Sequence, residues 1–391
     1  MNHFIPKRFE MAAMETPNAG STAPTGEAGP ASSAQTTTLA DGLAATASLP
    51  LVPYRGTQTA ECFSNPSDEL AAIVASAGVY DLGWRSFLRC AGEDRVRWLN
   101  GMVTNFVGGL EENTGCYAFV LNAQGRIQGD LDIYRRADAL WLETDLAQSK
   151  TLTAFLDHYI IMDDVTVEPE PAWTAIGIAG PSAAEKIAAA GFPVAPSPMH
   201  LVDTFWREHP VVVVATYSPL VPRYEIWMQQ DHVGDIWTAL TGAGAVPCGA
   251  ISIEQLRILE GTPAYSIDIT NKDLPQETNQ MRAIHFAKGC YLGQEIVERI
   301  HSRGNLHRTF SGFVLADARP AVPTPLLADG KLAGEITSIA RVLLPGVGER
   351  VLALGNIRRE ALERNAACIA GETTATPSKL PFDFVGNAVQ P

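Results

Sequence analysis

The chain has 391 residues, of which 46% are hydrophobic and 18% are charged, so it can bury two or three hydrophobic cores. Its formal net charge of -14 argues against a general nucleic-acid binder or a protein of anionic membranes, because attraction to phosphate needs a basic surface. No apolar run approaches the ~20 residues of a membrane span. The six cysteines are scattered and include no C-x-x-C pair, which disfavours a metal site or a disulfide framework and favours a cytoplasmic location.

Residues 1–57 are predicted to form a disordered leader. Residues 11–50 are dominated by Ala, Thr, Ser, Gly and Pro without hydrophobic periodicity, a composition that buries too little apolar surface to offset the entropy of ordering. The leader lacks both the apolar core of a signal peptide and the Arg-rich, acid-poor composition of a mitochondrial presequence. Residues 371–391 likewise lack periodicity and are predicted to form a flexible tail.

Between these ends, segments with strand and helix periodicity alternate. A first group has predicted strands over 86–90, 116–121, 131–134 and 139–143 and helices over 93–99 and 149–159. A second group has predicted strands over 174–179, 210–216 and 224–228 and helices over 183–190, 232–240 and 253–260. Short strands over 310–315, 331–339 and 350–354, broken by Pro and Gly, then indicate a small β-barrel. The fold class is therefore predicted as mixed α+β rather than a doubly wound parallel sheet.

One thiol stands out in the segment 288–295, KGCYLGQE, directly before a predicted helix over 294–300. Unpaired amides and the helix dipole favour an anion at a helix start, and Lys288 acts in the same direction, so Cys290 is a candidate reactive thiol. Gly289 and Gly293 indicate unusual backbone dihedrals or a close approach to a ligand. The alternative is that Cys290 is a small hydrophobe packed in a tight turn, the usual fate of a free cysteine.

Two other features suggest a binding site. Asp130 and Asp132 are two residues apart on a strand, so both carboxylates can face one cleft, where their like charges would raise one pKa. Positive charge also gathers around the Cys290 segment of this acidic chain, which offers a local site for an anionic ligand. The cationic residues are Lys288, Arg299, Arg303 and Arg308, with His301 and His307.

The segment 275–279, followed by 288–295 and by Arg303-Gly304, resembles the signature of the YgfZ-type folate-binding proteins. The wider chain, from about Ala77 to Ala370, is similar to the parent GcvT family, the aminomethyltransferase (T-protein) of the glycine cleavage system. The similar pieces are 78–82, 121–125, 130–131, 180–181, 246–249 and 256–261. This resemblance implies two interleaved α+β subdomains over 58–305 and a C-terminal β-barrel over 306–370, arranged around a folate channel.

The resemblance also implies a function. YgfZ-type proteins assist the assembly or repair of iron–sulfur clusters in a tetrahydrofolate-dependent way, so the implied cofactor is tetrahydrofolate and the implied partners are iron–sulfur client or assembly proteins. Cys290 would be the catalytic residue, assisted by Lys288. The implied folate-contacting residues are Asn122, Asp130, Tyr291, Gln294, Glu295 and Arg303.

Departures from the T-protein bear on the alternatives. Gly129 stands where that enzyme has the first of two aspartates, and the segment 217–223 lacks the acid expected to anchor the pterin there. These differences favour the accessory factor over a folate-dependent aminomethyltransferase with Asp130 as the base or an electrostatic anchor. A non-catalytic folate sensor or scaffold is the third alternative, and whether the chain is an enzyme stays open at this point.

Overall fold

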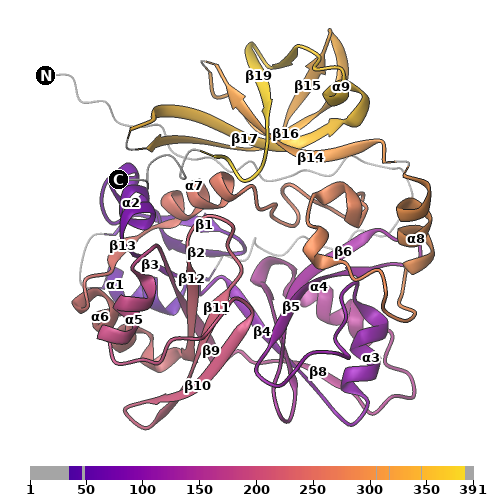
Figure 1. Cartoon of the computed structure of the whole chain (residues 1–391). Helices are drawn as coiled ribbons and strands as arrows, with labels where there is room; N and C mark the ends of the chain where they lie inside the picture. The colour runs from indigo at the N-terminus through magenta and orange to yellow at the C-terminus, as the bar shows by residue number, and fades with distance from the viewer. Residues whose placement is uncertain (1–34, 46–48, 305, 317, 345, 384–391) are drawn as a thin grey trace, which may run out of the picture.

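The computed structural model describes residues 35–45, 49–304, 306–316, 318–344 and 346–383. Two α+β halves stand side by side beneath a closed β-barrel (Figure 1). None of the helices in these residues has the length and apolar character needed to cross a membrane. The predicted α+β fold with a C-terminal β-barrel is confirmed.

The first half is built on a five-stranded antiparallel sheet in the order β5-β6-β7-β4-β8. Its strands are β4 (Arg85–Ala91), β5 (Gly115–Leu121), β6 (Ile127–Arg135), β7 (Leu140–Asp145) and β8 (Thr166–Pro169), and its helices are α3 (Arg95–Met102) and α4 (Leu146–Asp157). Leu99 of α3 and Leu152 of α4 join Leu131 of β6 in one buried core. The face of β6 that carries Leu131 is therefore covered by helices, and the opposite face is turned toward the second half.

The second half is built on a six-stranded sheet in the order β10-β11-β12-β9-β3-β13. Its strands are β3 (Gly78–Asp81), β9 (Trp173–Ala179), β10 (His200–Trp206), β11 (His209–Thr216), β12 (Arg223–Gln229) and β13 (Val246–Cys248). Its helices are α1 (Thr38–Ala44), α2 (Pro66–Ala75), α5 (Ala183–Ala189), α6 (Val233–Gly242) and α7 (Ala250–Glu260), and a separate hairpin joins β1 (Leu51–Tyr54) to β2 (Thr57–Ala60). Because β3 precedes the whole five-stranded sheet in the chain, the two halves are interleaved.

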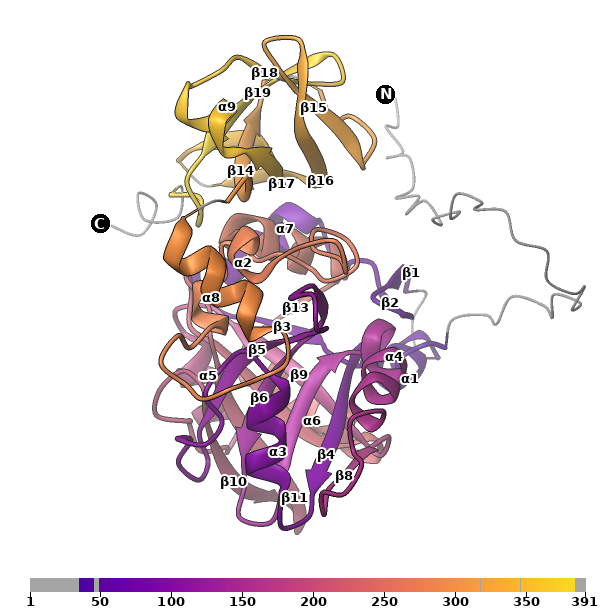
Figure 2. The ribbon, with the colours of Figure 1, turned by 90° about the vertical axis from the view of Figure 1, so that its right-hand side faces the viewer.

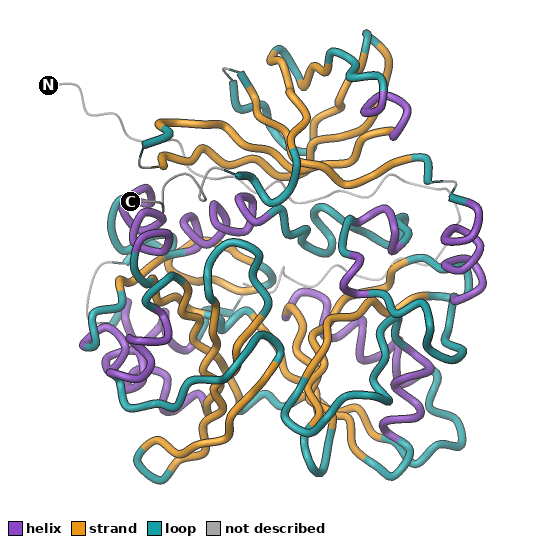
Figure 3. Tube along the Cα trace, in the orientation of Figure 1, coloured by secondary structure: helices purple, strands orange, loops and turns teal. Residues whose placement is uncertain are grey.

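The two sheets stand beside each other below the barrel (Figure 3), and aromatic side chains pack between them. The ring of Trp227 on β12 lies 4.9 Å from Phe87, 5.2 Å from Tyr134 and 6.1 Å from Trp141, centroid to centroid. All four rings belong to one buried cluster. Since large aromatic rings bury much apolar area, this packing fixes the separation of the sheets and the polar groups between them.

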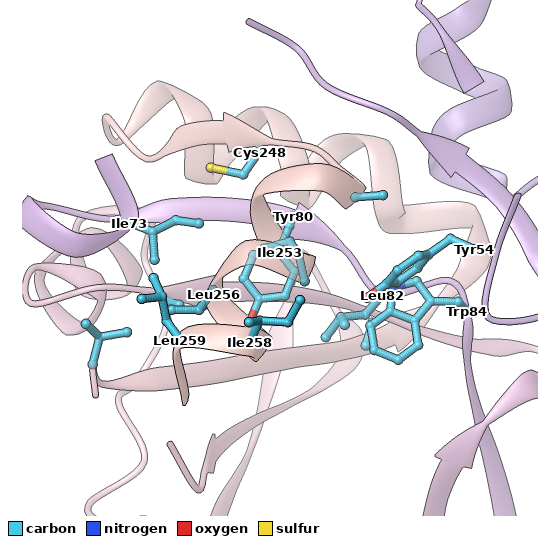
Figure 4. Packing of buried hydrophobic residues seen from close by; sticks show 14 of the residues in the cluster. Tyr54, Ile73, Tyr80, Leu82, Trp84, Cys248, Ile253, Leu256, Ile258 and Leu259 are labelled. Carbon is cyan, nitrogen blue, oxygen red and sulfur yellow. The ribbon is translucent and has the colours of Figure 1, made fainter. Parts of the chain in front are cut away.

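The barrel closes in the order β14-β17-β16-β15-β18-β19 and has its own core. Its elements are β14 (Arg308–Leu315), β15 (Thr324–Ala328), β16 (Lys331–Leu344), β17 (Gly348–Arg358), α9 (Arg359–Glu363), β18 (Cys368–Ala370) and β19 (Thr373–Ser378). The barrel rests on α7, where Arg257 donates hydrogen bonds to Ser338 at 2.7 Å and to Asp268 at 2.6 Å. The other side of α7 packs Ile253 and Leu256 among buried side chains of the six-stranded half (Figure 4).

The predicted disordered leader over 1–57 is wrong for the part that the structure describes. Helix α1 buries Leu39 and Ala40, and its N-cap Thr37 donates its hydroxyl to the carboxylate of Asp81 on β3. Strand β1 also lies within the predicted leader. The pattern was hidden because a helix this short presents only one pair of apolar residues at i and i+4, Leu39 and Leu43, within an Ala- and Thr-rich stretch. Residues 1–34 lie outside the described residues.

The predicted flexible tail over 371–391 is also wrong where the chain is described. Strand β19 closes the barrel by pairing with β14 and β18. Beyond it, Phe382 is fully buried, and its amide donates to the carbonyl oxygen of Leu259 at 2.9 Å. The barrel therefore extends past the predicted boundary at residue 370, because alternate Thr and Ala residues can form a strand without a strongly apolar pattern.

We expect Leu39→Ala to lower the free energy of unfolding by about 2–5 kcal/mol, because the substitution removes a buried side chain from the core of the six-stranded half. Thermal and denaturant unfolding of the full-length protein measure the effect. Gly42→Ala in the same helix is the matched control, since a Cβ at that position meets no atom within 4 Å. Equal stability of the Leu39→Ala variant and the wild type would show that α1 does not pack on the fold.

Candidate functional site

Strand β6 presents two carboxyl groups on the face that is turned toward the second half. Tyr117 of β5 donates its hydroxyl to Oδ2 of Asp130 at 2.6 Å, and the side-chain amide of Gln148 donates to Oδ1 at 2.6 Å. Burial raises the pKa of Asp130, and the nearby Asp145 acts in the same direction. Asp130 is therefore held in one orientation by two donors on either side of it.

Asp132, the next residue on this face, is less fully bonded. It lies opposite Tyr117 on β5 and opposite Glu143 on β7 in the sheet register. Its contact with Arg85 is a long one, 3.5 Å from Oδ2 of Asp132 to Nη2 of Arg85. Burial and the negative charge of Glu143 raise the pKa of Asp132 to about 7, although Arg85 opposes them. Asp132 can therefore gain or lose a proton near neutral pH, and its oxygens retain capacity to accept hydrogen bonds.

Arg85 of β4 is the cation at the centre of these acids. Its Nε donates to Glu143 at 2.6 Å, and its Nη1 donates to Asp145 at 2.5 Å. Asp145 also receives a bond from Arg55 at 2.6 Å. Burial alone would raise the pKa of Asp145, but Arg55 and Arg85 together hold it below its usual value. Because both arginines bond Asp145, less of their positive charge is available to the other buried carboxyl groups.

A carboxyl pair bridges the two sheets. Glu143 of β7 and Glu225 of β12 approach each other between the sheets, and burial raises the pKa of both carboxyl groups. Burial raises the pKa of Glu143 to about 8, so the pair as a whole retains a proton near neutral pH. Glu225 accepts a bond from the indole of Trp227 at 2.8 Å.

Among the described residues, no three His, Cys, Asp or Glu side chains are arranged to hold a metal ion.

The KGCYLGQE segment belongs to the covering chain, which comprises η2 (Pro275–Thr278), η3 (Met281–Ala283) and α8 (Gln294–Arg303) (Figure 2). Lys288 is buried, and its ammonium donates to the carbonyl oxygens of Asn100, Val103 and Asn105 at 2.6 Å each. Burial lowers the pKa of Lys288 to about 8. All three protons of the ammonium are used in these bonds, so Lys288 anchors the segment and has no proton to donate to the Cys290 thiolate.

Cys290 itself is exposed, whereas the other five cysteines are buried or half-buried. The predicted helix over 294–300 is confirmed as α8, which begins at Gln294 with Gly293 as its N-cap. Cys290 therefore lies before the first turn of the helix, as predicted. The observed geometry supports an accessible thiol, and it does not support activation of that thiol by Lys288.

The two glycines of the segment differ. Gly293 has a φ of 80°, and a Cβ there would lie 2.6 Å from the carbonyl oxygen of Asn122, so this position requires glycine. Gly289 has open space around it and no positive φ, so the expectation of a special backbone there is wrong. The side-chain oxygen of Asn122 accepts from the amides of Gln124 and Arg126 at 3.0 Å each. Asn122 thus shapes the β5–β6 turn that contacts Gly293.

The other residues implied as folate contacts fall in different environments. Tyr291 is buried with its ring centroid 4.8 Å from Nζ of Lys288, and burial raises its pKa to about 12. Gln294 is half-buried, while Glu295 and Arg303 are exposed in the first and last turns of α8. Within the described chain, none of these four side chains has a hydrogen bond or ion pair to the acids of β6 and β7. Only Asp130 of the implied set belongs to that acid cluster.

Several residues of the cluster were not singled out from the sequence. Glu143 and Glu225 lie far apart in the chain and meet only because the sheets face each other. Arg282 of η3 also reaches this face, with its guanidinium carbon 4.1 Å from the ring centroid of Tyr117 and 4.3 Å from that of Tyr217. No sequence motif marks these side chains. They come together only through the register of the strands and the course of the covering chain across the sheets.

We expect Glu143→Gln to flatten the pH dependence of stability. The raised pKa of Glu143 means that its contribution to stability is present below pH 4.5 and is lost as the pH rises toward about 8. One such proton gives a slope of up to about 1.4 kcal/mol per pH unit. The glutamine keeps an acceptor for Arg85 and a donor for Glu225, so the variant should gain stability relative to the wild type at pH 8.

Melting curves of both proteins between pH 4.5 and pH 8 measure this difference. Glu112→Gln, at an exposed position, is the control for loss of one carboxyl group and should leave the wild-type slope unchanged. Parallel curves for the wild type and the Glu143→Gln variant would show that the bridging pair holds no extra proton.

Known proteins resemble this chain over most of its length. A putative chloroplastic transferase of Arabidopsis thaliana is 24% identical over 337 residues, covering 82% of this chain and 75% of that protein. An aminomethyltransferase of Frankia alni is 24% identical over 296 residues, covering 73% of this chain and 81% of the relative. The crystal structure of the glycine cleavage system aminomethyltransferase T from Bartonella henselae shares the fold, with a TM-score of 0.81 and 19% identity over 90% of this chain and 98% of that one. The GCVT N-terminal domain matches residues 51–288, more than half of the chain, so this protein belongs to the GcvT family.

Proposed function

We propose that this protein binds tetrahydrofolate at the acid cluster between the sheets and serves as an accessory factor in the assembly or repair of iron–sulfur clusters. Membership of the GcvT family supports folate binding, because relatives in this family include aminomethyltransferases. The exposed cysteine in the KGCYLGQE segment supports the accessory role. The two parts of the proposal rest on different residues and are tested separately.

The observation that carries the folate proposal is the pair of carboxyl groups on β6. A reduced pteridine presents neighbouring N–H donors on its aminopyrimidinone ring, and a carboxylate can accept two such bonds side by side. Asp132 has this capacity because its contact with Arg85 is long. Asp130, fixed by Tyr117 and Gln148, adds a second oriented acceptor. When bound, tetrahydrofolate would supply a carrier for one-carbon units.

The Cys290 thiol is suited to bind an iron–sulfur cluster, or the sulfur of one, for a short time. A thiolate is both a nucleophile and a soft metal ligand, and an exposed thiol can be reached by another protein. A single cysteine cannot hold an iron–sulfur cluster that normally needs four ligands, so the partner's thiolates would complete any shared site. The buried Lys288 contributes by fixing the backbone that presents Cys290.

Aminomethyl transfer is the second candidate function. Its support is Asp132, whose raised pKa of about 7 suits a group that exchanges a proton near neutral pH. A turnover assay with a carrier-bound aminomethyl group separates the two functions. Release of the aminomethyl carbon to tetrahydrofolate would favour the transferase, and absence of turnover together with folate binding would favour the accessory factor.

We expect the full-length protein to bind tetrahydrofolate in isothermal titration calorimetry and Asp132→Asn to weaken that binding at least about tenfold. A hydrogen bond to a charged group contributes about 1.5–3 kcal/mol, which corresponds to this loss. Asp157→Asn, at the exposed end of α4, is the matched control and should bind like the wild type. No heat of binding at millimolar tetrahydrofolate, in a wild-type protein shown to be folded, would refute the folate proposal.

For the thiol, we expect Cys290→Ala to fold, to bind tetrahydrofolate normally and to fail to restore iron–sulfur enzyme activity in cells that lack their own YgfZ-type protein. Lys288→Met should instead lower the stability by about 1–3 kcal/mol, because it leaves buried carbonyl groups without a donor. Rescue is read beside a melting curve for each variant. Cys62→Ala controls for the loss of a thiol, and full rescue by the Cys290→Ala variant would end the reactive-cysteine hypothesis.

A further inference from the structure

Arg282 is positioned where the covering chain meets both sheets. Its guanidinium carbon lies over the ring of Tyr117 on β5 and over that of Tyr217 in the loop between β11 and β12. The main-chain oxygen of Arg282 accepts a bond from the side-chain amide of Asn105 at 2.9 Å, and this same amide donates to the carbonyl oxygen of Tyr117 at 2.8 Å. The backbone and the side chain of Arg282 are therefore both held in place.

The hydrogen-bond donors of Arg282 are mostly unused. Its Nε donates to the side chain of Gln280 at 3.3 Å, whereas neither terminal nitrogen donates to an acceptor within the described residues. It also forms no ion pair with them. Arg85 and Arg257, by contrast, each make several short bonds to carboxylates. Contact with an aromatic ring uses the face of a guanidinium and leaves its edge, with the terminal N–H groups, available for an acceptor in its plane.

The surroundings of Arg282 are accessible and partly apolar. Tyr217 is 43% exposed, Met281 is 46% exposed, and Phe106 is 39% exposed and packs its ring 5.3 Å from that of His285. A cation set among such side chains is less well hydrated than one on an open surface, which strengthens its interaction with an anion. The planar fork of arginine matches a carboxylate, to which it can donate two parallel bonds.

We propose that Arg282 binds a carboxylate group of the ligand that occupies this site. The identity of the ligand rests on the proposed folate function. The presence of an anion site rests only on the contacts of Arg282. The carboxylate has two possible sources, the glutamyl part of a folate or a separate small amino acid bound beside the pteridine. In either case Arg282 binds the carboxylate of the ligand and the acids of β6 accept from its N–H donors. Together these contacts orient the ligand.

Calorimetry on the full-length protein tests this with four probes: tetrahydrofolate, a tetrahydropterin without the aminobenzoylglutamate part, p-aminobenzoylglutamate alone, and glycine in the presence of the tetrahydropterin. Arg282→Gln removes the charge, and Arg282→Lys keeps the charge but removes the fork. Arg358→Gln, at an exposed barrel position, is the matched control. Melting curves establish that each variant is folded.

We expect Arg282→Gln to weaken a carboxylate-bearing probe at least about tenfold and to leave the tetrahydropterin unchanged, with Arg282→Lys giving a smaller loss. A loss on p-aminobenzoylglutamate assigns the carboxylate to the folate, and a loss confined to glycine assigns it to a separate amino acid. The proposal is overturned if no carboxylate-bearing probe binds the wild type, if Arg282→Gln weakens none of them, or if it weakens the tetrahydropterin equally. If both reduced pteridines fail to bind while p-aminobenzoylglutamate binds through Arg282, the folate function fails and the anion site stands.

Discussion

The ion-pair network around Arg85 is the interaction on which the arrangement of the site depends. Packing two sheets face to face buries several carboxyl groups, and a buried charge is tolerated only when it is paired, bonded or neutralised by a proton. Arg85 and Arg55 neutralise Asp145, and Arg85 also bonds Glu143. Asp132 keeps only a long contact with Arg85, and Glu225 makes no ion pair within the described residues, so a deficit of bonded positive charge remains between the sheets. A proton fills part of this deficit, and a ligand rich in N–H donors can fill the rest.

Much of the fold could be predicted from local patterns. The periodicity indicated the strands that became β4, β5, β6 and β9 and the helices that became α4 and α7, because these are long or strongly apolar. The same reasoning placed Asp130 and Asp132 on one face of β6, since alternation along a strand is a local property. It missed α1, β13 and β19, which are short and contain few large apolar residues, and whose structure depends on partners distant in the chain.

The candidate site was only partly predictable for a related reason. Glu143 and Glu225 become neighbours because the two sheets face each other, and Arg282 reaches the site from η3, a short 3₁₀ helix of the covering chain. The proximity of Lys288 and Cys290 in the sequence suggested that one acts on the other. In the fold, the lysine side chain turns into the protein toward three carbonyl groups while the thiol stays outside. Adjacent residues thus serve separate purposes, one structural and the other open to chemistry.

The interleaving of the two halves has a consequence for how the chain is made. Strand β3 (Gly78–Asp81) lies between β9 and β13, and β13 (Val246–Cys248) pairs with it in parallel. A ribosome that has synthesised the chain only as far as β8 (Thr166–Pro169) has made the whole five-stranded sheet, but β3 must wait for strands that have not yet been made. Its apolar residues and free edges are exposed in that interval, which makes the nascent six-stranded half a natural client for chaperones. Pairing across such a sequence separation also predicts slow refolding after full denaturation, even though each finished sheet has an ordinary core.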